Sequence, residues 1–250
     1  MSDVIFLADL DNCIFQTIRK CPADVPHDQL VPLGYAKDGS PMSYATPRQM
    51  GFLEWMLSTG EVIPVTARSL DATRRVRFPY TRAICASGGV MLGHDGKPDP
   101  EWTAALKKES APFDENIREL HRRAGIIAER EGADIRTWIM DEDGVQCCLV
   151  LKSNVDDVPQ VHAIGAELRK GMPWDWTYHT NGNNVAITPP HIGKARAVAR
   201  LMPKLREEKP GCTIIGIGDS ITDGPFMELC DMAMCPPKSQ IGKIMFSGRL

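Results

Sequence analysis

Four short, mainly apolar runs constrain this chain most strongly. Each run is followed directly by a small or polar residue. Apolar runs of this length are typical of strands that are buried on both faces, as in a parallel sheet covered by helices. The sequence therefore predicts parallel strands at residues 4–8, 62–65, 83–86 and 213–217.

Helix signals lie between these runs. Thr46 and Gln49 form a capping box around Pro47, which occupies the first helical position. The apolar periodicity that follows ends at Gly60. A second helix is expected over residues 195–205. Strands that alternate with helices predict an α/β fold with a Rossmann-like, doubly wound parallel sheet.

The middle of the chain has a different pattern. Apolar residues between Phe113 and Ala128 recur at spacings of three and four, which is typical of an amphipathic helix. Asp-Gly and Asn-Gly turns then indicate two β-hairpins with a helix between them. The order αββ-αββ predicts a small α+β domain with an antiparallel sheet. The expected elements are strands 135–140 and 145–151, helix 158–170, and strands 174–180 and 184–188.

This α+β domain interrupts the α/β domain, because a further strand and an aspartate-rich turn follow it. The predicted core therefore comprises residues 1–90 and 190–250, and the inserted domain comprises residues 91–189. Aromatic residues alternate along one expected strand and are predicted to pack on one side of its sheet. They are Trp174, Trp176 and Tyr178.

Residues 19–45 fit neither pattern. They contain four prolines, two glycines and no sustained periodicity. Long irregular segments within compact domains usually have a function or are mobile. One interpretation is a lid or rim beside a binding site that alters what the site accepts. A decorated surface loop is the alternative.

Charge and cysteine content exclude several classes of protein. Basic and acidic residues number 29 and 32, so the net charge of −3 argues against a nucleic-acid binder. Eight cysteines among 250 residues are too few for a disulfide scaffold. They include no C-x-x-C pair, so the sequence does not predict a structural zinc site. No apolar stretch approaches the length of about 18 residues that a transmembrane helix needs, and the first residues have no signal-peptide pattern. We expect a reduced, cytoplasmic protein that binds neither membranes nor nucleic acids.

Two pairs of aspartates follow the first and last predicted strands. Asp9 and Asp11 follow the first strand, and Asp219 and Asp223 follow the last. The carboxyl ends of parallel strands meet at one edge of the sheet, where open α/β sheets bind ligands. A helix cap explains one of these carboxylates but not two pairs. Four carboxylates at one edge would repel one another without a divalent cation, and oxygen ligands favour Mg²⁺.

Two further polar residues occupy chemically suggestive places. Thr66 follows the second strand, where its hydroxyl and the next backbone N–H groups could hold a phosphate oxygen, although such a threonine is often only a helix cap. Lys194 begins the helix before the last strand. A cation there opposes the helix dipole and needs an anionic partner, unless it is simply an exposed surface lysine.

The order of these elements resembles the four motifs of the haloacid dehalogenase superfamily, from residue 4 to about residue 235. The motifs are Asp9-x-Asp11, Thr66, Lys194 and Gly218-Asp219-x-x-x-Asp223. The inserted αββ-αββ domain resembles the type C2B cap of that superfamily. Within it, the chain is similar to sucrose-phosphate-phosphatase-like and Cof-type sugar phosphatases. The departures are Asn12, Cys13 and Ala67, where many members have glycine, threonine and glycine.

The resemblance implies a role for each motif residue. Asp9 would be the nucleophile that forms an aspartyl-phosphate, and Asp11 would be the general acid and base. Thr66 and Lys194 would neutralise and position the phosphoryl oxygens. Mg²⁺ would be held by Asp9, the backbone carbonyl of Asp11, Asp219 and Asp223. The implied phosphate and substrate contacts are Thr66, Ala67, Arg68, Ser87 and Lys194, with Arg136, Lys152 and Asn183 in the cap.

The resemblance implies a Mg²⁺-dependent phosphomonoesterase that hydrolyses a small phosphorylated metabolite, such as a sugar phosphate. A phosphomutase on the same scaffold is one alternative, because it would return the phosphoryl group to the substrate instead of water. A non-catalytic binding or regulatory protein is a second alternative. An enzyme acting on nucleic-acid ends is a third, which the net charge of −3 disfavours. No oligomeric state is predicted.

Overall fold

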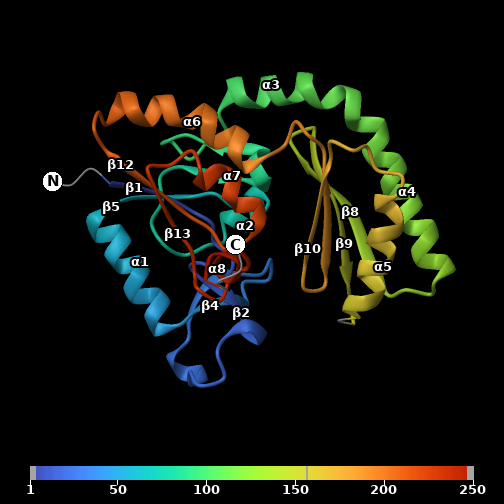
Figure 1. Ribbon diagram of the computed structural model, residues 1–250, viewed down its shortest axis with the longest axis horizontal. Helices are drawn as coiled ribbons and strands as arrows, with labels where there is room; N and C mark the ends of the chain where they lie inside the picture. The colour runs from blue at the N-terminus through green and yellow to red at the C-terminus, as the bar shows by residue number, and fades with distance from the viewer. Residues whose placement is uncertain (1–3, 156, 247–250) are drawn as a thin grey trace. The chain divides into compact units, whose positions relative to one another are not determined.

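The computed structural model describes residues 4–155 and 157–246. The chain divides into two compact units, each described here by itself. The core unit comprises the residues up to Asp99 and those from Lys194 onward, and the inserted unit comprises Pro100–Gly193. The core unit contains a parallel sheet, and the inserted unit contains a separate antiparallel sheet (Figure 1).

The parallel sheet brings both ends of the chain together. Its strand order is β13-β12-β1-β5, and every pair is parallel. Ala8 at the end of β1 lies level with Ile217 on one side and Pro64 on the other, so the residues after all three strands share one edge. The strands are β1 (Val4–Ala8), β5 (Gly60–Pro64), β12 (Thr213–Ile217) and β13 (Met232–Met234).

The strand expected at residues 83–86 is paired only partly as predicted. β6 (Ala83–Cys85) is linked to the parallel sheet by one parallel bridge, between Val65 and Ile84, but its full pairing is antiparallel, with β7 (Val90–Leu92). The chain reverses between these strands because Ala86 and Ser87 adopt left-handed conformations, with φ of 49° and 56°. An apolar run of three or four residues does not distinguish the two pairings.

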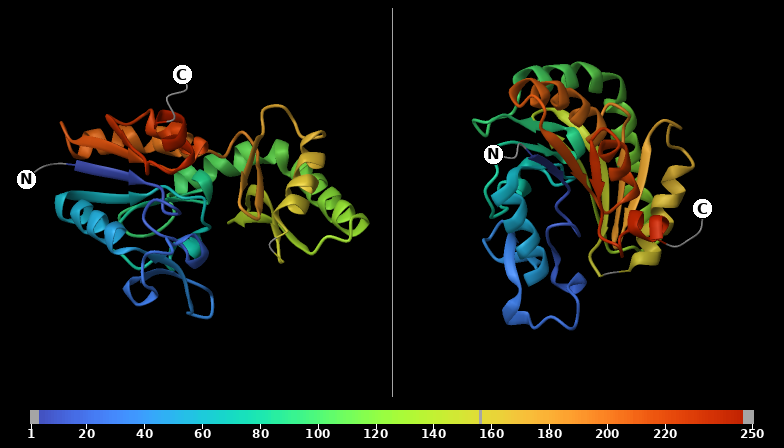
Figure 2. Two further views of the ribbon diagram at one scale, coloured as in Figure 1. Left: turned by 60° about the horizontal axis from the view of Figure 1, so that its bottom comes forward. Right: turned by 60° about the vertical axis from the view of Figure 1, so that its left-hand side comes forward.

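Helices cover both faces of the parallel sheet. α1 (Pro47–Thr59) and α6 (Lys194–Glu208) lie on opposite sides of it (Figure 2). The predicted capping box is confirmed, because the Thr46 hydroxyl accepts from the Gln49 N–H at 3.3 Å while the Gln49 side chain accepts from the Thr46 N–H at 3.0 Å. The shorter helices are α2 (Leu70–Thr73), η3 (Ala86–Gly88), η5 (Ile221–Asp223), α7 (Gly224–Met227) and α8 (Gln240–Phe246).

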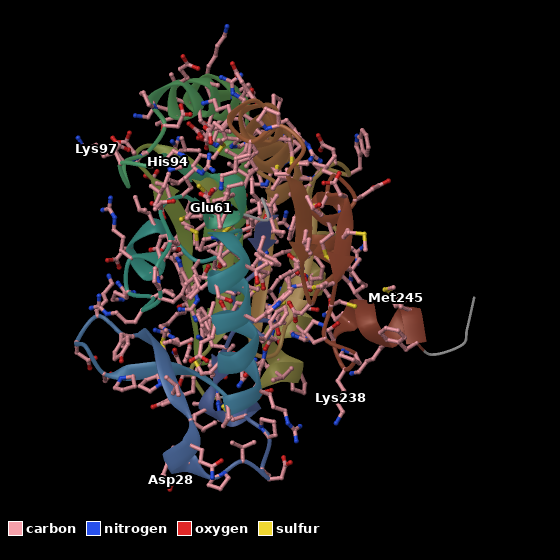
Figure 3. The ribbon with its side chains drawn as sticks, turned by 90° about the vertical axis from the view of Figure 1, so that its left-hand side faces the viewer. Asp28, Glu61, His94, Lys97, Lys238 and Met245 are labelled. Atoms are coloured by element: carbon pink, nitrogen blue, oxygen red, sulfur yellow. The ribbon has the colours of Figure 1, made fainter. Side chains whose placement is uncertain are left out.

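Residues 19–45, expected to be irregular, contribute two strands to a small antiparallel sheet, which we call the insert sheet. It consists of β2 (Gln16–Thr17), β3 (Val31–Tyr35) and β4 (Pro41–Ala45), in the order β2-β4-β3. Two 3₁₀ turns, η1 (Ile18–Lys20) and η2 (His27–Gln29), precede β3, and Asp28 marks the outer end of this segment in Figure 3. Pro32 lies within β3 and Pro41 begins β4, and a proline in such a run weakens the sequence signal for a strand.

The inserted unit contains both predicted helix-strand-strand repeats and one additional helix at its start. Its sheet has the order β10-β11-β9-β8, and one face packs against two helices through buried apolar side chains. The helices are α3 (Pro100–Ser110), η4 (Ala111–Phe113), α4 (Asp114–Arg130) and α5 (Val158–Arg169). The strands are β8 (Ile135–Glu142), β9 (Val145–Ser153), β10 (Thr177–Asn181) and β11 (Asn184–Thr188).

The expected row of three aromatic side chains is wrong at its first position. Trp174 precedes β10 and is 96% exposed. Trp176, by contrast, is buried and contacts Phe113 edge to face at 6.1 Å. Tyr178 packs at the edge of the same apolar cluster. The alternation fails because β10 begins only at Thr177, so residues 174–176 are not bound by the geometry of a strand.

Within residues 4–155 and 157–246, no helix has both the length and the hydropathy needed to cross a membrane.

The close approach of β1 and β5 at Gly60 is open to a stability test. A Cβ at Gly60 would lie 2.0 Å from the backbone oxygen of Val4. Because that oxygen belongs to the central strand, Gly60→Ala should separate two paired strands and lower the free energy of unfolding by about 1–3 kcal/mol. Urea unfolding followed by circular dichroism measures this change.

Gly51→Ala is the matched control, because Gly51 lies in α1 and a Cβ there would meet nothing within 4 Å. It should raise the free energy of unfolding by about 1 kcal/mol, through helix propensity alone. Equal effects of the two substitutions would contradict the steric explanation.

Candidate active site

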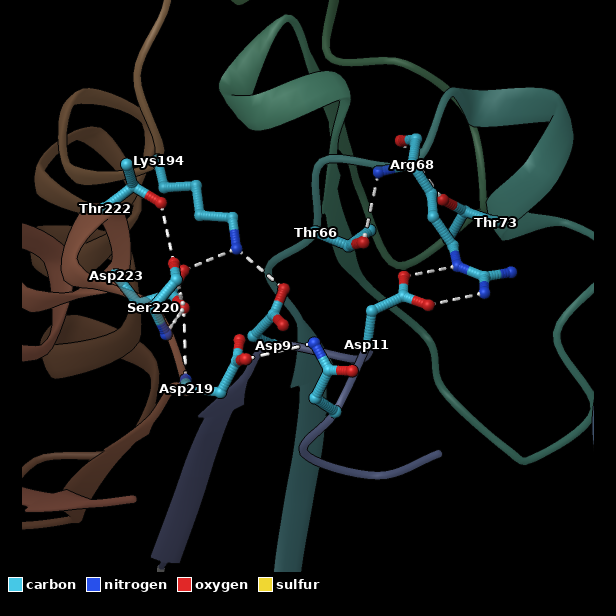
Figure 4. A network of polar contacts seen from close by, with 11 residues as sticks. Asp9, Asp11, Thr66, Arg68, Thr73, Lys194, Asp219, Ser220, Thr222 and Asp223 are labelled. Carbon is cyan, nitrogen blue, oxygen red and sulfur yellow. Dashed lines mark hydrogen bonds and ion pairs between the residues drawn. The ribbon is translucent and has the colours of Figure 1, made fainter. Parts of the chain in front are cut away.

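Lys194 lies between two carboxylates at the carboxyl edge of the parallel sheet (Figure 4). It is the first residue of α6, and its Nζ donates to Asp9 Oδ1 at 2.7 Å and to Asp223 Oδ1 at 2.6 Å. All three side chains are at least nine-tenths buried. The alternative of an exposed surface lysine is therefore wrong. A buried ammonium at the start of a helix needs anionic partners, and these two aspartates supply them.

The sheet itself positions the two aspartates that follow its central strands. The Asp9 N–H donates to the Ile217 carbonyl at 2.8 Å, which extends the ladder between β1 and β12 by one residue. Asp219 follows β12 two residues later and accepts a hydrogen bond from Asn12 Nδ2 at 3.0 Å. Motif residues more than 200 positions apart are thus brought together by strand pairing.

Asp223 has a structural role in addition to its ion pair. Its Oδ2 accepts from the backbone N–H groups of Asp219 at 3.2 Å and Ser220 at 3.0 Å, and from the Ser220 hydroxyl at 2.9 Å. Gly218 makes this turn possible, because a Cβ there would lie 2.4 Å from the Asp223 Cβ. The same carboxylate therefore caps the turn after β12 and contacts Lys194.

The charges at this edge are not balanced within the cluster. Burial raises the pKa of Asp9 to about 8, and Lys194 only partly offsets this, because Asp223 and Asp11 add negative charge nearby. Burial also raises the pKa of Asp219, with Asp223 as the next largest cause. For Asp223, burial is opposed by the ammonium of Lys194 and the amides of the turn, and its pKa is lowered. The single positive charge of Lys194 is thus shared among the carboxylates of Asp9, Asp219 and Asp223.

Three potential ligands for a cation converge beside this ion pair. One ligand atom from each of Asp9, Cys13 and Asp219 lies within 4.8 Å of the other two. The two carboxylates suit a hard divalent cation, which would relieve the charge imbalance. Burial and the neighbouring aspartates raise the pKa of the Cys13 thiol well above its usual value, so the thiol stays neutral in the absence of a metal. The donor set fits Mg²⁺ through its oxygens.

Asp11 is turned toward Arg68 and away from Asp219 (Figure 4). Arg68 Nε donates to Asp11 Oδ2 at 2.7 Å, and Arg68 Nη2 donates to Asp11 Oδ1 at 2.8 Å. This is the bidentate geometry of the strongest arginine–carboxylate pairs. The sequence predicts a phosphate or substrate contact for Arg68, but the structure places its guanidinium on the second aspartate of the first motif.

Thr66 is buried at the start of the loop that carries Arg68. Its hydroxyl accepts from the Arg68 backbone N–H at 3.1 Å, and its carbonyl accepts from the Ser87 N–H at 2.9 Å. Ala67 lies between them in the same turn. Thr66 and Arg68, from the turn of the second motif, and Ser87, a separately expected substrate contact, therefore gather at one edge of the core unit with Asp11.

The three candidates in the inserted unit do not all share one environment. Arg136 and Lys152 lie opposite each other on β8 and β9, with Arg136 exposed and Lys152 partly exposed. Asn183 lies in the turn between β10 and β11, and its Nδ2 donates to the Ser153 carbonyl at 3.2 Å. Arg136 and Lys152 are thus paired across two strands, whereas Asn183 stabilises a turn.

Several residues at the site were not predicted. Asn12 adopts φ of 64°, donates to Asp219 and accepts from Lys20 Nζ at 3.1 Å. Cys13, which the sequence marks only as a departure from the family motif, lies beside Asp9 and Asp219. Ser43 of β4 accepts from Arg68 Nη2 at 2.8 Å. The only indication for Asn12 in the sequence is that it is polar at a position where many family members have glycine. Nothing in the sequence indicates a role for Ser43.

No family model and no curated protein matches the chain. Solved structures do match it in fold. The C-terminal domain of trehalose-6-phosphate phosphatase from C. albicans is 14% identical, with a TM-score of 0.59, covering 91% of this chain and 73% of that one. A trehalose-6-phosphate phosphatase related protein is 15% identical, with a TM-score of 0.52, covering 93% and 86%.

A third match is the sucrose-phosphatase of Synechocystis sp., solved in complex with sucrose and phosphate. It is 15% identical, with a TM-score of 0.50, and the match covers 99% of this chain and 97% of that one. The chain therefore has the fold of sugar-phosphate phosphatases. The predicted α/β core with a separate antiparallel domain is confirmed.

The raised pKa of Asp9 predicts how stability depends on pH in metal-free protein. The pKa is 3.8 in the unfolded chain and about 8 in the fold, so the folded state binds the proton more tightly. This contribution is fully present below the lower value and is lost as pH rises through the higher one. At most about 1.4 kcal/mol is lost per pH unit.

Asp9→Asn removes this titration. In chelator, the melting temperature of the variant minus that of the wild type should increase as pH is raised from about 5 to about 8. Asp28→Asn, at an exposed position, should give a difference that does not change with pH. A pH-independent difference for Asp9→Asn would mean that Asp9 titrates at its ordinary pKa.

Proposed function

We propose that this protein is a Mg²⁺-dependent phosphomonoesterase that hydrolyses a small sugar phosphate through an aspartyl-phosphate on Asp9. The observation that carries the proposal is the buried contact of Lys194 with Asp9 and Asp223, beside Asp219, at the ligand-binding edge of the sheet. The fold shared with sugar-phosphate phosphatases supports it. The proposed reaction needs every one of these groups.

In this mechanism Asp9 attacks phosphorus. Lys194 holds Asp9 Oδ1 at 2.7 Å, which fixes the carboxylate and leaves Oδ2 as the attacking atom. The ammonium also lies where it can neutralise a phosphoryl oxygen, while Thr66 and the backbone N–H groups after it hold another. Phosphoryl transfer is mainly a matter of placing charge, and the buried ion pair provides a rigid frame for it.

Asp11 would give a proton to the leaving alcohol and then take one from the water that hydrolyses the aspartyl-phosphate. Asp9, Asp219 and the backbone carbonyl of Asp11 would hold Mg²⁺, with Asp223 close by. When bound, Mg²⁺ supplies positive charge to the phosphoryl oxygens. Its binding would also offset the negative charge of Asp223 and Asp11, which adds to the effect of burial in raising the pKa of Asp9.

The inserted unit is proposed as the cap that supplies the leaving-group pocket. Arg136, Lys152 and Asn183 are the candidate contacts, because their donors suit sugar hydroxyls and a carbohydrate-phosphate charge. A sugar phosphate is the favoured substrate class, since the matched structures include a sucrose-phosphatase and a trehalose-6-phosphate phosphatase. The eight cysteines form no disulfide, and we propose a cytoplasmic enzyme on that ground.

A phosphate-release screen over phosphorylated sugars tests the proposed activity. Wild-type protein should release inorganic phosphate from at least one of them in Mg²⁺ and none in chelator. Asp9→Asn should lower kcat by at least about 10³-fold, because the nucleophile is lost. The exposed Asp28→Asn should leave kcat unchanged.

Unchanged turnover of Asp9→Asn would exclude the aspartyl-phosphate. An isomeric sugar phosphate in place of inorganic phosphate would identify a phosphomutase instead. Absence of any turnover across the screen would favour a binding protein on this fold.

Proton release tests the metal site separately from catalysis. Because the pKa values of Asp9 and Asp219 are raised in the absence of metal, Mg²⁺ binding near pH 7 should displace protons. We expect a fraction of one proton up to about one proton per Mg²⁺ bound, measured with a pH indicator in weakly buffered solution. Asp219→Asn should weaken Mg²⁺ binding, whereas Asp231→Asn, at the far end of the same core, should not. Binding without proton release would contradict the predicted charge imbalance.

A further inference from the structure

The insert sheet touches the candidate active site through Ser43. This serine lies in β4, its side chain is fully buried, and its Oγ accepts from Arg68 Nη2 at 2.8 Å. The nitrogen that bonds Ser43 is the same one that donates to Asp11 Oδ1 at 2.8 Å. A single guanidinium therefore connects the insert sheet to the second aspartate of the first motif.

Two other contacts hold Arg68 in place, one at its guanidinium and one at its backbone. The Arg68 Cζ lies 4.7 Å from the centre of the Phe15 ring, which places the guanidinium over the aromatic face. The backbone N–H of Arg68 donates to the Thr66 hydroxyl at 3.1 Å, so the base of the side chain is held as well. The side chain is 11% exposed. Arg68 is thus held at its backbone, along one face and at its tip.

The insert sheet is shaped around this side chain. A Cβ at Gly34 of β3 would lie 3.0 Å from the Ser43 Cβ and 3.2 Å from Arg68 Nη1. The register between β3 and β4 is irregular on both sides of Gly34. Irregular registers of this kind redirect side chains and are frequent beside active sites. Glycine at this position leaves room for both the serine and the arginine.

We propose that the insert sheet positions the general acid and base of the reaction. Ser43 and Gly34 hold the guanidinium of Arg68 in one orientation, and Arg68 holds the carboxyl of Asp11 in one rotamer. This proposal rests on the proposed function, and it assigns a task to a segment that the sequence suggests is either a lid or rim beside a binding site or a surface loop. Ser43 and Arg68 are positioning residues, because both act through Asp11 and not on the phosphate.

A direct contact between Arg68 and the substrate phosphate is the competing explanation. The fork geometry favours the positioning role, because Nε and Nη2 of Arg68 both donate to the carboxylate of Asp11. The two explanations differ in what they affect. Loss of a phosphate contact should lower kcat/KM for all phosphate esters alike. Loss of acid positioning should lower kcat/KM only for esters whose leaving group needs a proton.

Two aryl phosphates of similar size separate these cases. Phenol has a pKa of about 10, like tyrosine, and leaves poorly without a proton. The p-nitrophenolate ion leaves readily without one. The ratio kcat/KM reports the steps up to formation of the aspartyl-phosphate, which is the step in which the acid acts. The comparison therefore isolates proton donation from later hydrolysis and from product release.

Ser43→Ala is the decisive variant. We expect kcat/KM to fall about tenfold for phenyl phosphate and to change by less than about twofold for p-nitrophenyl phosphate. Ser40→Ala is the matched control, because Ser40 precedes β4 and its exposed side chain bonds only Asp38 among the contacts described. Ser40→Ala should leave kcat/KM unchanged for both phenyl phosphate and p-nitrophenyl phosphate.

Arg68→Lys provides a second variant that keeps the charge but cannot form the fork. It should show the same selective loss, and adding Ser43→Ala to it should cause little further change, because both act on one interaction. If Ser43→Ala does not fold, as judged by circular dichroism, Arg68→Lys decides the question.

Equal losses for both substrates would overturn the positioning role and favour a phosphate contact. Additive losses in the double variant would also overturn it, because Ser43 would then act independently of Arg68. Failure of the wild type to hydrolyse either ester would instead contradict the proposed function itself.

Discussion

One buried ammonium determines how the edge of the core is organised. Lys194 contacts Asp9 and Asp223, which follow different strands and lie 185 and 29 residues away from it in the sequence. Burying an ammonium is unfavourable unless anionic partners surround it, and burying those carboxylates is equally unfavourable without the ammonium. Each group is therefore tolerable only because the others are present, and their mutual dependence holds two loops and the start of α6 at one point.

Charge imbalance is the second property of this cluster. Lys194 pairs with Asp9 and Asp223, but its single positive charge does not balance all the nearby carboxylates. The pKa values of Asp9 and Asp219 therefore remain raised, with burial as the largest cause. The fold can hold these carboxylates close together in spite of their repulsion, because the pairing of β1 with β12 brings Asp9 and Asp219 together. A site of this kind has a rigid frame and an unfavourable charge, which is the condition under which a divalent cation or a phosphoryl group binds with the greatest gain.

The sequence predicted the repetitive parts of this structure. Apolar runs identified β1, β5 and β12, and the capping box identified the start of α1 within one residue. The motif residues could be located in the sequence because each follows a recognisable strand or begins a recognisable helix, and the structure brings Asp9, Lys194 and Asp223 into contact. The pairing of β6 was missed, because it depends on left-handed conformations at Ala86 and Ser87 that ordinary residues rarely signal.

The contacts of Arg68 could not be predicted, for a different reason. An arginine two residues after Thr66 is equally suited to a phosphate and to a carboxylate, and only the three-dimensional position of Asp11 decides between them. Ser43 carried no signal, because its strand is short, begins with proline and pairs with an irregular neighbour. Residues whose role depends on a contact between distant segments are the ones that a single sequence conceals.

The placement of Lys194 has a consequence for the order in which the protein is made. During synthesis, β1 and Asp9 emerge first, but β12 and Lys194 emerge only after the whole inserted unit. The central strand of the sheet must then wait for a neighbour that lies more than 200 residues later in the chain. Pairing over such separations is slow and leaves apolar edges exposed in the meantime. One edge of β1 therefore stays unpaired until β12 has been synthesised, although β5 can pair with its other edge much earlier.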